Sequence, residues 1–215
     1  MLASLIVRGT DQFEGTDWER AFANAIGADW KPSNVGLDDV VLGNCCWGAK
    51  TVKNNKPFSA RAVRLISGRN SLDFSYGISD VRSIDESEVG ARVLAIYNDR
   101  VSSVRARFKH VRTVVLMKGP DLRENAVFEV ETVRLEAEKF VWSWNKNGNL
   151  VGFENGVQRV TWQPHGSQFT LHESVPSSRS MFRLLPPDNV FEISAIRLLE
   201  SVGFEEDWVQ VVESV

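Results

Sequence analysis

Residues 36–53, GLDDVVLGNCCWGAKTVK, combine acidic and basic side chains at a spacing that could support hydrolysis. Asp38 and Asp39 open a short apolar run, residues 43–44 (Gly-Asn) form a turn signal, and the extended run that follows carries Lys50 and Lys53. This pattern predicts two strands joined by a tight turn. A carboxylate and an ammonium on neighbouring strands can share a metal ion, a phosphate and a water, the minimum for cutting a phosphodiester. An ordinary surface hairpin with solvated charges is the alternative interpretation.

Other residue types that often carry chemistry form no recognisable motif. The three histidines lack a metal-binding spacing (His110, His165 and His172). Cys45 and Cys46 are adjacent, which rarely allows a good disulfide, and a reducing cytosol is the simplest environment for them. Without a nearby histidine they predict neither a zinc site nor a thiolate nucleophile. The sequence also lacks G-x-S-x-G, G-x-x-x-x-G-K and G-x-G-x-x-G.

Composition predicts one soluble globular domain covering residues 1–215. Apolar residues make up 43% and charged residues 25%, and the length suits a single well-buried α/β domain. The net charge of −3 argues against a nucleic-acid binder, although a local basic face can coexist with acidic regions. No apolar run reaches the length of a membrane span, and residues 1–8 lack a basic leader. We therefore expect a cytoplasmic protein.

The N-terminal half predicts helices around the hairpin. Residues 16–28 form an amphipathic pattern in which Thr16 could cap and Glu19 would complete a capping box. Residues 59–66 suggest a short helix, residues 67–79 a loop, and residues 87–108 the strongest helix. Two strands follow, over 113–117 and 126–135.

From residue 140 the chain becomes rich in turns and aromatic residues. Residues 147–148 (Asn-Gly) predict a hairpin turn, 157–163 and 168–173 predict strands, and 190–201 a last helix. The order of elements predicts a mixed α/β domain with a central sheet, in which residues 1–138 form the core and 139–215 a β-rich part.

A helix containing a glutamate, then an acid that opens a strand, then a hairpin return ending in x-x-Lys, resembles the core of PD-(D/E)XK nucleases. This superfamily includes the type II restriction endonucleases and is recognised by arrangement more than by letters. The resemblance covers roughly residues 16–53, and the later segment TWQPHGSQF more loosely resembles small bacterial restriction enzymes. It implies a restriction-endonuclease-like central mixed sheet flanked by helices.

The resemblance also implies roles for particular residues. Asp38 or Asp39 matches the first metal-binding acid, and Lys50 matches the lysine that positions or activates the attacking water. Ten residues lie between Asp39 and Lys50, a usual separation. Gly48, however, stands where the family normally has Glu or Asp. The second metal ligand must then come from elsewhere, with Glu19 as the first candidate and Asn44 as a weaker one.

A second placement of the metal site fits the same resemblance. Pro120-Asp121 precedes Glu129-Val130-Glu131, which reads as PD followed by E-x-E. Three carboxylates could bind Mg²⁺ through hard oxygen ligands. The alternative interpretation of Glu129 and Glu131 is the solvent-facing side of an edge strand.

If DNA is the substrate, side chains in the C-terminal half could read base edges, and basic residues at the end of the long helix and just after it could contact phosphates. The predicted base-reading residues cluster at turns, where ordinary turn chemistry is the alternative. The predicted DNA contacts are Asn145, Lys146, Asn147, Gln163, His165, Gln168, Arg105, Arg107 and Lys109.

The sequence therefore predicts a Mg²⁺-dependent, site-specific endonuclease for double-stranded DNA of the restriction type. Asp39, with Glu19 or Asp38, would hold the metal, and Lys50 would align or deprotonate the attacking water. Palindromic sites favour twofold symmetry, so a homodimer is expected. The alternative is a non-catalytic DNA-binding or phage-defence interaction module that kept a degenerate nuclease fold.

Overall fold

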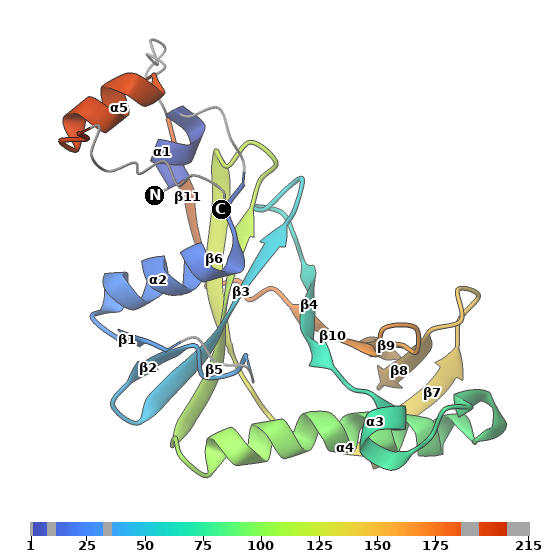
Figure 1. Ribbon diagram of the computed structural model, residues 1–215. Coiled ribbons are helices and arrows are strands. Elements are labelled where there is room, and N and C mark those ends of the chain that lie inside the picture. Colours follow the sequence, from blue (N-terminus) through green and yellow to red (C-terminus); the bar gives the residue numbers. More distant parts are fainter. Residues whose placement is uncertain (1, 8–11, 32–35, 186–193, 206–215) are drawn as a thin grey trace, which may run out of the picture.

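The computed structural model describes residues 2–7, 12–31, 36–185 and 194–205, and its strands form two sheets (Figure 1). Sheet A has the order β1 (Asp29–Trp30), β2 (Val40–Leu42), β3 (Cys45–Lys53), β5 (His110–Lys118), β6 (Glu124–Glu131) and β11 (Ser180–Arg183). Sheet B has the order β4 (Ala62–Arg69), β10 (Gln168–Ser174), β9 (Val157–Gln163), β8 (Leu150–Glu154) and β7 (Phe140–Trp144).

The helices of the described residues flank these sheets. They are α1 (Leu2–Val7), α2 (Gly15–Ile26), α3 (Leu72–Tyr76), α4 (Glu86–Arg105) and α5 (Ala195–Ser201), with the short 3₁₀ helices η1 (Val81–Ser83) and η2 (Ala137–Lys139). Figure 1 shows α2 beside sheet A and α4 running along sheet B. No helix of the described residues is long and apolar enough to cross a membrane.

Sheet A is mixed because β3 and β5 run parallel along their full length, whereas its other pairs are antiparallel. Parallel neighbours need a long crossover connection. Here the connection contains β4, α3 and α4. The chain leaves sheet A after β3, and β4 pairs with β10 in sheet B. One excursion of the chain therefore links the two sheets.

Sheet A packs different apolar layers on its two faces. On one face α2 contributes Trp18 and Ala23, which pack with Trp47 and Ala49 of β3. On the other face β4 packs against buried residues of β5 and β6 (Val115, Met117, Ala126 and Phe128). Because successive strand residues point to opposite faces, the side chains of Ala49 and Lys50 face different layers.

Sheet B is an antiparallel meander whose inner face packs on α4. The close approach depends on Gly90, because a Cβ there would lie 2.2 Å from an atom of the Trp142 indole. Trp142 is 5% exposed and stacks on Phe140 with ring centroids 5.4 Å apart. An aromatic core thus fixes the long helix to the C-terminal sheet.

The structure confirms the α/β composition, the tight turn at residues 43–44 and the hairpin at 147–148. It divides the strands between two sheets, where the sequence suggested one central sheet. Sheet B comes mainly from residues 140–174, so the β-rich C-terminal part is present, although β4 joins it from the N-terminal half.

Three predictions of local structure need correction. The helix predicted over 59–66 is wrong, because β4 covers that region and buries alternate residues such as Val63 and Leu65. The loop predicted over 67–79 contains α3, which Ser71 caps. The last helix begins at Ala195, and residues 190–193 lie outside the described residues.

The N-cap of helix α2 lies two residues earlier than predicted. It is Glu14, which forms a capping box with Asp17 and leaves Thr16 and Glu19 out of the cap. Gly27 ends the helix in a left-handed conformation, as expected for a C-terminal stop. Glu19 is therefore available for contacts outside its own helix.

Candidate functional site

A cleft of about 420 Å³ lies between α2, the second half of β3, and β4. β2 pairs only with residues 45–47 of β3, so the residues that follow face this cleft rather than a neighbouring β2 strand. The cleft is lined by Glu19, Lys50, Lys53 and Arg64, among other residues. Glu19 and Lys50, which the sequence proposed as partners, both line this cleft. We call this region the edge cleft.

Lys50 is half-buried and held by the segment that precedes β2. Its Nζ donates a hydrogen bond to the carbonyl oxygen of Gly36 at 3.2 Å. A lysine fixed at one end by a backbone carbonyl keeps its remaining protons for a ligand. The ammonium therefore has a defined position on the wall of the edge cleft.

The structure explains why position 48 carries a glycine where the nuclease pattern has an acid. A Cβ at this position would lie 2.7 Å from the carbonyl oxygen of Gly36 and 3.1 Å from the Cα of Leu37. The backbone of residues 36–37 occupies the space where an acidic side chain would stand. Gly48 is therefore required by packing, and a carboxylate cannot replace it unless this segment moves.

Asp39 lies against the same stretch of β3. Its carboxylate is 3% exposed, and Oδ2 accepts a hydrogen bond from the backbone N–H of Ala49 at 3.2 Å. Ala49 itself lines the edge cleft. The aspartate is thus tied to the strand residue next to Lys50, at the border of the cleft.

Asp38 makes a different contact. Its Oδ2 pairs with Nη2 of Arg107 at 2.8 Å, and its Oδ1 is buried without a hydrogen-bond partner among the described residues. The Asp38 side chain is 9% exposed, whereas that of Arg107 is 52% exposed. Arg107 was predicted to contact phosphate, and it lies instead beside this buried acid.

The cysteine thiols next to this acid are not activated. Burial, followed by the negative charge of Asp38, raises the pKa of Cys46 to about 12. Burial also raises the pKa of Cys45. Both thiols therefore stay protonated at neutral pH, which argues against a cysteine nucleophile.

Glu19 projects from α2 with one oxygen engaged. Its Oε2 accepts a hydrogen bond from the indole Nε1 of Trp30 at 2.9 Å, and Arg20 stacks on the same indole at 4.1 Å. Asn44, the weaker candidate ligand, lies in the β2–β3 turn, at the opposite end of β3 from the edge cleft. Of the two candidates for the missing acid, only Glu19 lines the cleft.

The second predicted metal site does not assemble. Asp121 accepts a hydrogen bond from the backbone N–H of Arg123 at 3.0 Å. Glu129 accepts from Nε1 of Trp47 at 2.9 Å and lies 3.0 Å from Nε of Arg112. Glu131 pairs with Arg105 at 2.8 Å. Each carboxylate has its own partner, and among the described residues no group of three or more His, Cys, Asp or Glu could hold a metal.

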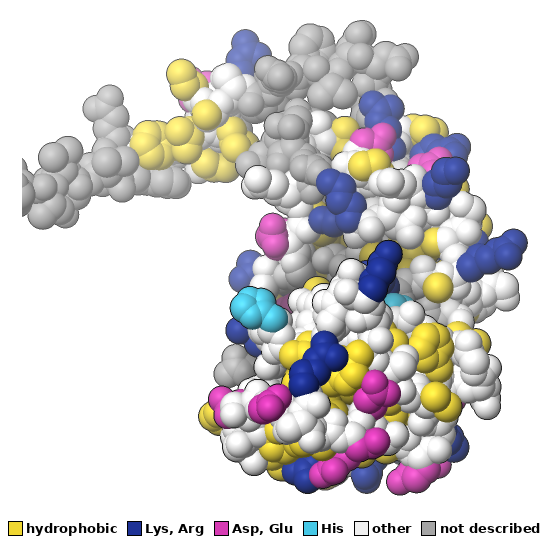
Figure 2. All heavy atoms as spheres, turned by 90° about the vertical axis from the view of Figure 1, so that its right-hand side faces the viewer, with side chains coloured by type: hydrophobic (Ala, Val, Ile, Leu, Met, Phe, Trp, Pro, Cys, Tyr) yellow, Lys and Arg dark blue, Asp and Glu magenta, His cyan; other side chains and the backbone are white. Residues whose placement is uncertain are grey.

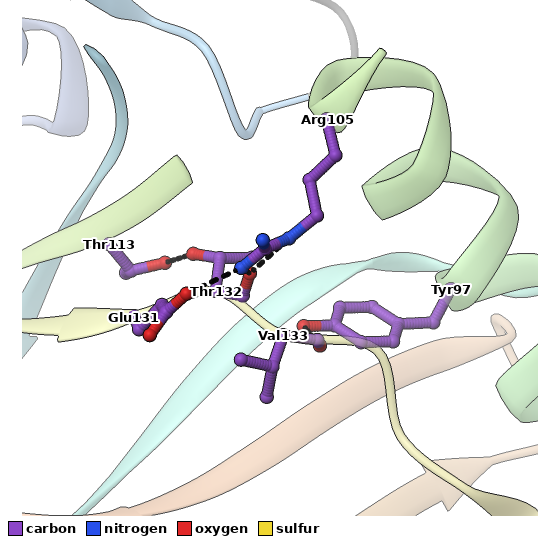
Figure 3. Close-up of polar contacts among 6 residues, drawn as sticks. All are labelled: Tyr97, Arg105, Thr113, Glu131, Thr132 and Val133. Atoms are coloured by element: carbon purple, nitrogen blue, oxygen red, sulfur yellow. Dashed lines mark hydrogen bonds and ion pairs between the residues drawn. The ribbon is translucent and has the colours of Figure 1, made fainter. Parts of the chain in front are cut away.

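Figure 3 shows how Arg105 joins the end of α4 to the end of β6. Its guanidinium donates to the backbone carbonyl of Thr132 at 2.7 Å as well as to Glu131. Thr113 and Thr132 share a hydrogen bond of 2.8 Å, and the hydroxyl of Tyr97 donates to the carbonyl of Val133 at 3.1 Å. Arg105, predicted to contact phosphate, therefore ties the end of α4 to the end of β6.

The predicted base-reading residues lie at two hairpins of sheet B. Asn145 uses its side-chain oxygen to accept from the backbone N–H of Asn147 at 2.9 Å, which stabilises the turn. Gln163 and Gln168 are opposite each other on β9 and β10, and His165 is exposed between them. Lys146, at the tip of the other hairpin, is exposed. The structure shows these side chains at reachable turns, without showing what they contact.

Cationic side chains do not form one patch on the face that Figure 2 shows, where Lys and Arg are spread among acidic groups. Lys109 is exposed just before β5. His172 of sheet B adds no positive charge at neutral pH, because burial lowers its pKa from the usual 6.5 and the charge of Arg64 lowers it further. The concentration of cations in the edge cleft is therefore a local feature of this molecule.

Comparisons with protein-family models, curated proteins and solved structures found no match to this chain.

Two cations of the edge cleft were not among the predicted site residues. Arg64 was assigned to a helix, so its place on β4 in the wall of the edge cleft was not foreseen. The signal was available, because Val63, Leu65 and Ser67 are buried in strict alternation with exposed neighbours. Lys53 was noticed in the hairpin but given no role, and it lines the same cleft.

Proposed function

We propose that this protein is a Mg²⁺-dependent, site-specific endonuclease for double-stranded DNA, with its chemistry at the edge cleft. The observation that carries the proposal is that Glu19, from α2, and Lys50, from β3, line one cleft. Asp39 supports it, because its carboxylate is hydrogen-bonded to the strand beside Lys50. The DNA substrate and the reaction rest on the resemblance to restriction endonucleases and on the side chains gathered here.

Three cations make the edge cleft suitable for a phosphodiester. Lys50, Lys53 and Arg64 lie on two elements around a single acidic group, Glu19. Contacts to DNA phosphates from lysine and arginine position a duplex without reading its sequence. An overall charge of −3 does not oppose this, since a ligand meets the local field at close range.

Among the described residues no group of three or more His, Cys, Asp or Glu could hold a metal, so the proposal relies on an ion that is shared with the substrate. Mg²⁺ is commonly bound by one or two carboxylates, with waters and substrate phosphates completing its coordination. Asp39 and Glu19 are the carboxylates that would hold it, and Oε1 of Glu19 accepts no hydrogen bond within the described part of the chain. When bound, the ion would stabilise the charge that develops on the phosphate.

Lys50 acts on the attacking water in this proposal. The carbonyl of Gly36 holds one of its N–H groups, so the others can orient a water or the phosphate oxygen beside it. Lys53 and Arg64 hold the flanking phosphates, and Asp39 stays fixed by the N–H of Ala49. The chain thus positions the reacting groups before substrate arrives.

A homodimer is part of the proposal, because a twofold protein matches a palindromic DNA site. Light scattering coupled to gel filtration measures the mass directly, with 24.1 kDa expected for a monomer. A monomeric mass both without DNA and on a palindromic duplex would contradict the dimer.

The structure also favours a second candidate, a non-catalytic DNA-binding module. The specific observation is Gly48, whose side-chain space is filled by the backbone of Gly36 and Leu37. A site with no acid at this position has fewer metal ligands than the related nucleases. The cations of the edge cleft would still bind a duplex.

One experiment separates the two candidates. Supercoiled plasmid DNA is incubated with the protein in Mg²⁺ or in EDTA, and the products are resolved on a gel. Discrete fragments that require Mg²⁺ support the nuclease, whereas retarded but intact DNA supports the binder. The test variant is Lys50→Ala, and Lys139→Ala is the matched control, because Lys139 is exposed on η2 and does not line the cleft.

The nuclease predicts that Lys50→Ala lowers cleavage by about a hundredfold or more, the scale of general acid–base catalysis. Lys139→Ala should cleave like the wild type. Equal cleavage by Lys50→Ala and the wild type would show that the edge cleft is not the active site, even if the activity is real.

A further inference from the structure

A second cavity, of about 600 Å³, lies on the α2 face of sheet A near the opposite end of β3. This volume is in the range of about 300–1,000 Å³ that small-molecule sites occupy. Its apolar walls come from α2, β2, the central strands and the segment before β11. The wall residues are Phe22, Ile26, Leu42, Val114, Val127 and Pro176.

Three polar groups form the floor of this cavity. Trp47 on β3 and Arg112 on β5 are register partners, and Glu129 lies on the neighbouring strand β6. The indole Nε1 of Trp47 donates to Oε2 of Glu129 at 2.9 Å, and Nε of Arg112 lies 3.0 Å from the same oxygen. The carboxylate and the guanidinium are thus held side by side by the sheet.

The outer atoms of this pair are available to a ligand. Within the described part of the chain, the terminal nitrogens of Arg112 donate no hydrogen bond, and Oε1 of Glu129 accepts none. The side chains of Arg112 and Glu129 are 36% and 44% exposed. The floor therefore offers an acceptor next to a donor fork, with no net charge.

The chemistry of the floor restricts the ligand. A simple anion would approach Arg112 only beside the carboxylate of Glu129. A hydrocarbon would cover the donor fork without giving it a partner, which is costly for a charged group. A planar ring with apolar faces and an edge carrying donors next to acceptors satisfies both the walls and the floor.

We propose that this cavity binds a guanine base. Guanine is the base whose edge places two neighbouring donors, N2–H and N1–H, beside two acceptors, O6 and N7. Glu129 would accept from the donors, and Arg112 would donate to O6 and N7, the pairing by which arginine most often recognises guanine. Adenine offers one donor flanked by acceptors, and thymine one acceptor on each side of a donor, so neither matches the floor. The base could come from a free guanine nucleotide or from an unpaired guanine in a nucleic acid strand.

Calorimetry in EDTA tests this proposal, so that DNA cleavage plays no part in the outcome. The protein is titrated with GMP, with AMP, with IMP, which lacks the 2-amino group, and with two single-stranded oligonucleotides that differ by one guanine. We expect GMP, or the oligonucleotide with guanine, to bind at least tenfold more tightly than its partner without guanine, and IMP to bind more weakly than GMP. Binding of GMP identifies a nucleotide as a sufficient ligand, whereas binding of the oligonucleotide alone identifies a strand.

The test variant is Glu129→Gln, which keeps an acceptor for Trp47 but loses the carboxylate. Glu131→Gln is the matched control, because Glu131 lies on the same strand but does not line the cavity. We expect Glu129→Gln to weaken guanine binding about tenfold or more, the scale of a charge-assisted hydrogen bond, and Glu131→Gln to leave it unchanged. The indole N–H resonance of Trp47 should shift on binding in the wild type.

Three results would overturn the proposal: no binding of any guanine ligand at millimolar concentration, equal binding of GMP and AMP, or equal weakening by the two glutamate variants. Because these measurements need neither Mg²⁺ nor cleavage, their failure would leave the edge-cleft nuclease untouched. Failure of the nuclease would likewise leave a guanine site intact.

Discussion

Two pairs of acidic residues were each candidates for a metal site, Asp38 with Asp39 directly before β2 and Glu129 with Glu131 on β6, and their environments in the structure differ. The inner pair, Asp38 and Asp39, is 7% and 3% exposed. The outer pair, Glu129 and Glu131, has side chains that are 44% and 65% exposed. Both pairs contact arginine, so the presence of an ion pair does not distinguish them.

The difference lies in what each carboxylate holds in place. Asp39 satisfies a buried backbone N–H of β3, and Asp38 is sealed beside Cys46 with one oxygen lacking a partner. The side chains of the outer carboxylates are 44% and 65% exposed, so water can replace a lost contact. The inner pair should therefore affect stability strongly, and the outer pair weakly.

The largest effect is expected from removing the cation of the inner pair. Arg107→Met leaves the Asp38 carboxylate buried without its partner, a change that costs about 3–5 kcal/mol in fully buried pairs. Since Arg107 is 52% exposed, we expect a smaller loss, about 2–3 kcal/mol in the free energy of unfolding. Urea denaturation measures it.

The double variant Arg107→Met with Asp38→Asn provides the control, because it leaves no unpaired charge. It should recover part of the stability lost by Arg107→Met alone. Asp38→Asn is also measured alone. If it destabilises the Arg107→Met variant as much as it destabilises the wild type, the unpaired charge is not the cause of the loss.

The second largest effect concerns the backbone of residues 36–37, which directly precedes the inner pair. Gly48→Ala places a Cβ 2.7 Å from the carbonyl oxygen of Gly36, so residues 36–37 must shift. Overpacking of this kind typically costs about 1–3 kcal/mol, and we expect the free energy of unfolding from urea denaturation to fall by about 2 kcal/mol. Gly43→Ala is a control for the loss of a glycine, since a Cβ there meets nothing within 4 Å. Its own cost comes from the positive φ of 56°.

Position 48 also tests the resemblance to nucleases. Gly48→Glu restores the acid of the family pattern, yet the structure predicts that it disrupts the segment 36–37 and lowers cleavage. Higher Mg²⁺-dependent cleavage by Gly48→Glu would show that this segment moves aside easily, contrary to the packing observed.

The third effect separates hydrogen bonding from charge at Asp39. Asp39→Ala leaves the N–H of Ala49 buried without this acceptor, which should cost about 1–2 kcal/mol. Asp39→Asn keeps an oxygen acceptor and should be more stable than the alanine variant. If the two variants unfold at the same urea concentration, the hydrogen bond to Ala49 contributes nothing measurable.

Local patterns allowed much of this fold to be predicted. The turn at residues 43–44 and the hairpin at 147–148 were read correctly, because Gly and Asn set the backbone there regardless of distant contacts. The long helix was also found, since its apolar spacing persists over α4. Each of these signals is contained within a few neighbouring residues.

What the sequence could not show was which strands share a sheet. β4 pairs with β10 across about half the chain, and no local pattern encodes that choice. The site was affected in the same way. Lys50 and Glu19 could be proposed from spacing. Arg64 could not, because it lies on β4, a strand that belongs to sheet B and borders the edge cleft. Gly48 gave a visible departure from the family pattern, and its cause became clear only from the backbone of residue 36.

The smallest effect is expected at the outer pair and is best seen by titration. The hydrogen bond from Arg105 holds the pKa of Glu131 below its ordinary value of 4.5, with the charge of Arg105 adding to the shift. Because the folded-state pKa is lowered, the contribution to stability is present above the unfolded pKa and disappears as the pH falls through the folded one. Because the Glu131 side chain is 65% exposed, this contribution is small, so Glu131→Gln should be only slightly less stable than the wild type at neutral pH, and the difference should vanish in acid.

Carboxyl ¹³C shifts, followed by NMR as the pH is lowered, measure this directly. The midpoint for Glu131 should lie below 4.5 and rise toward it in Arg105→Met. Glu173 supplies the internal reference, because burial raises its pKa despite the nearby Arg159, and Arg105 is not among the causes of that shift. A Glu131 midpoint that ignores the loss of Arg105 would mean that the guanidinium in Figure 3 serves only the carbonyl of Thr132. The outer pair would then be even less coupled to the fold than its exposure suggests.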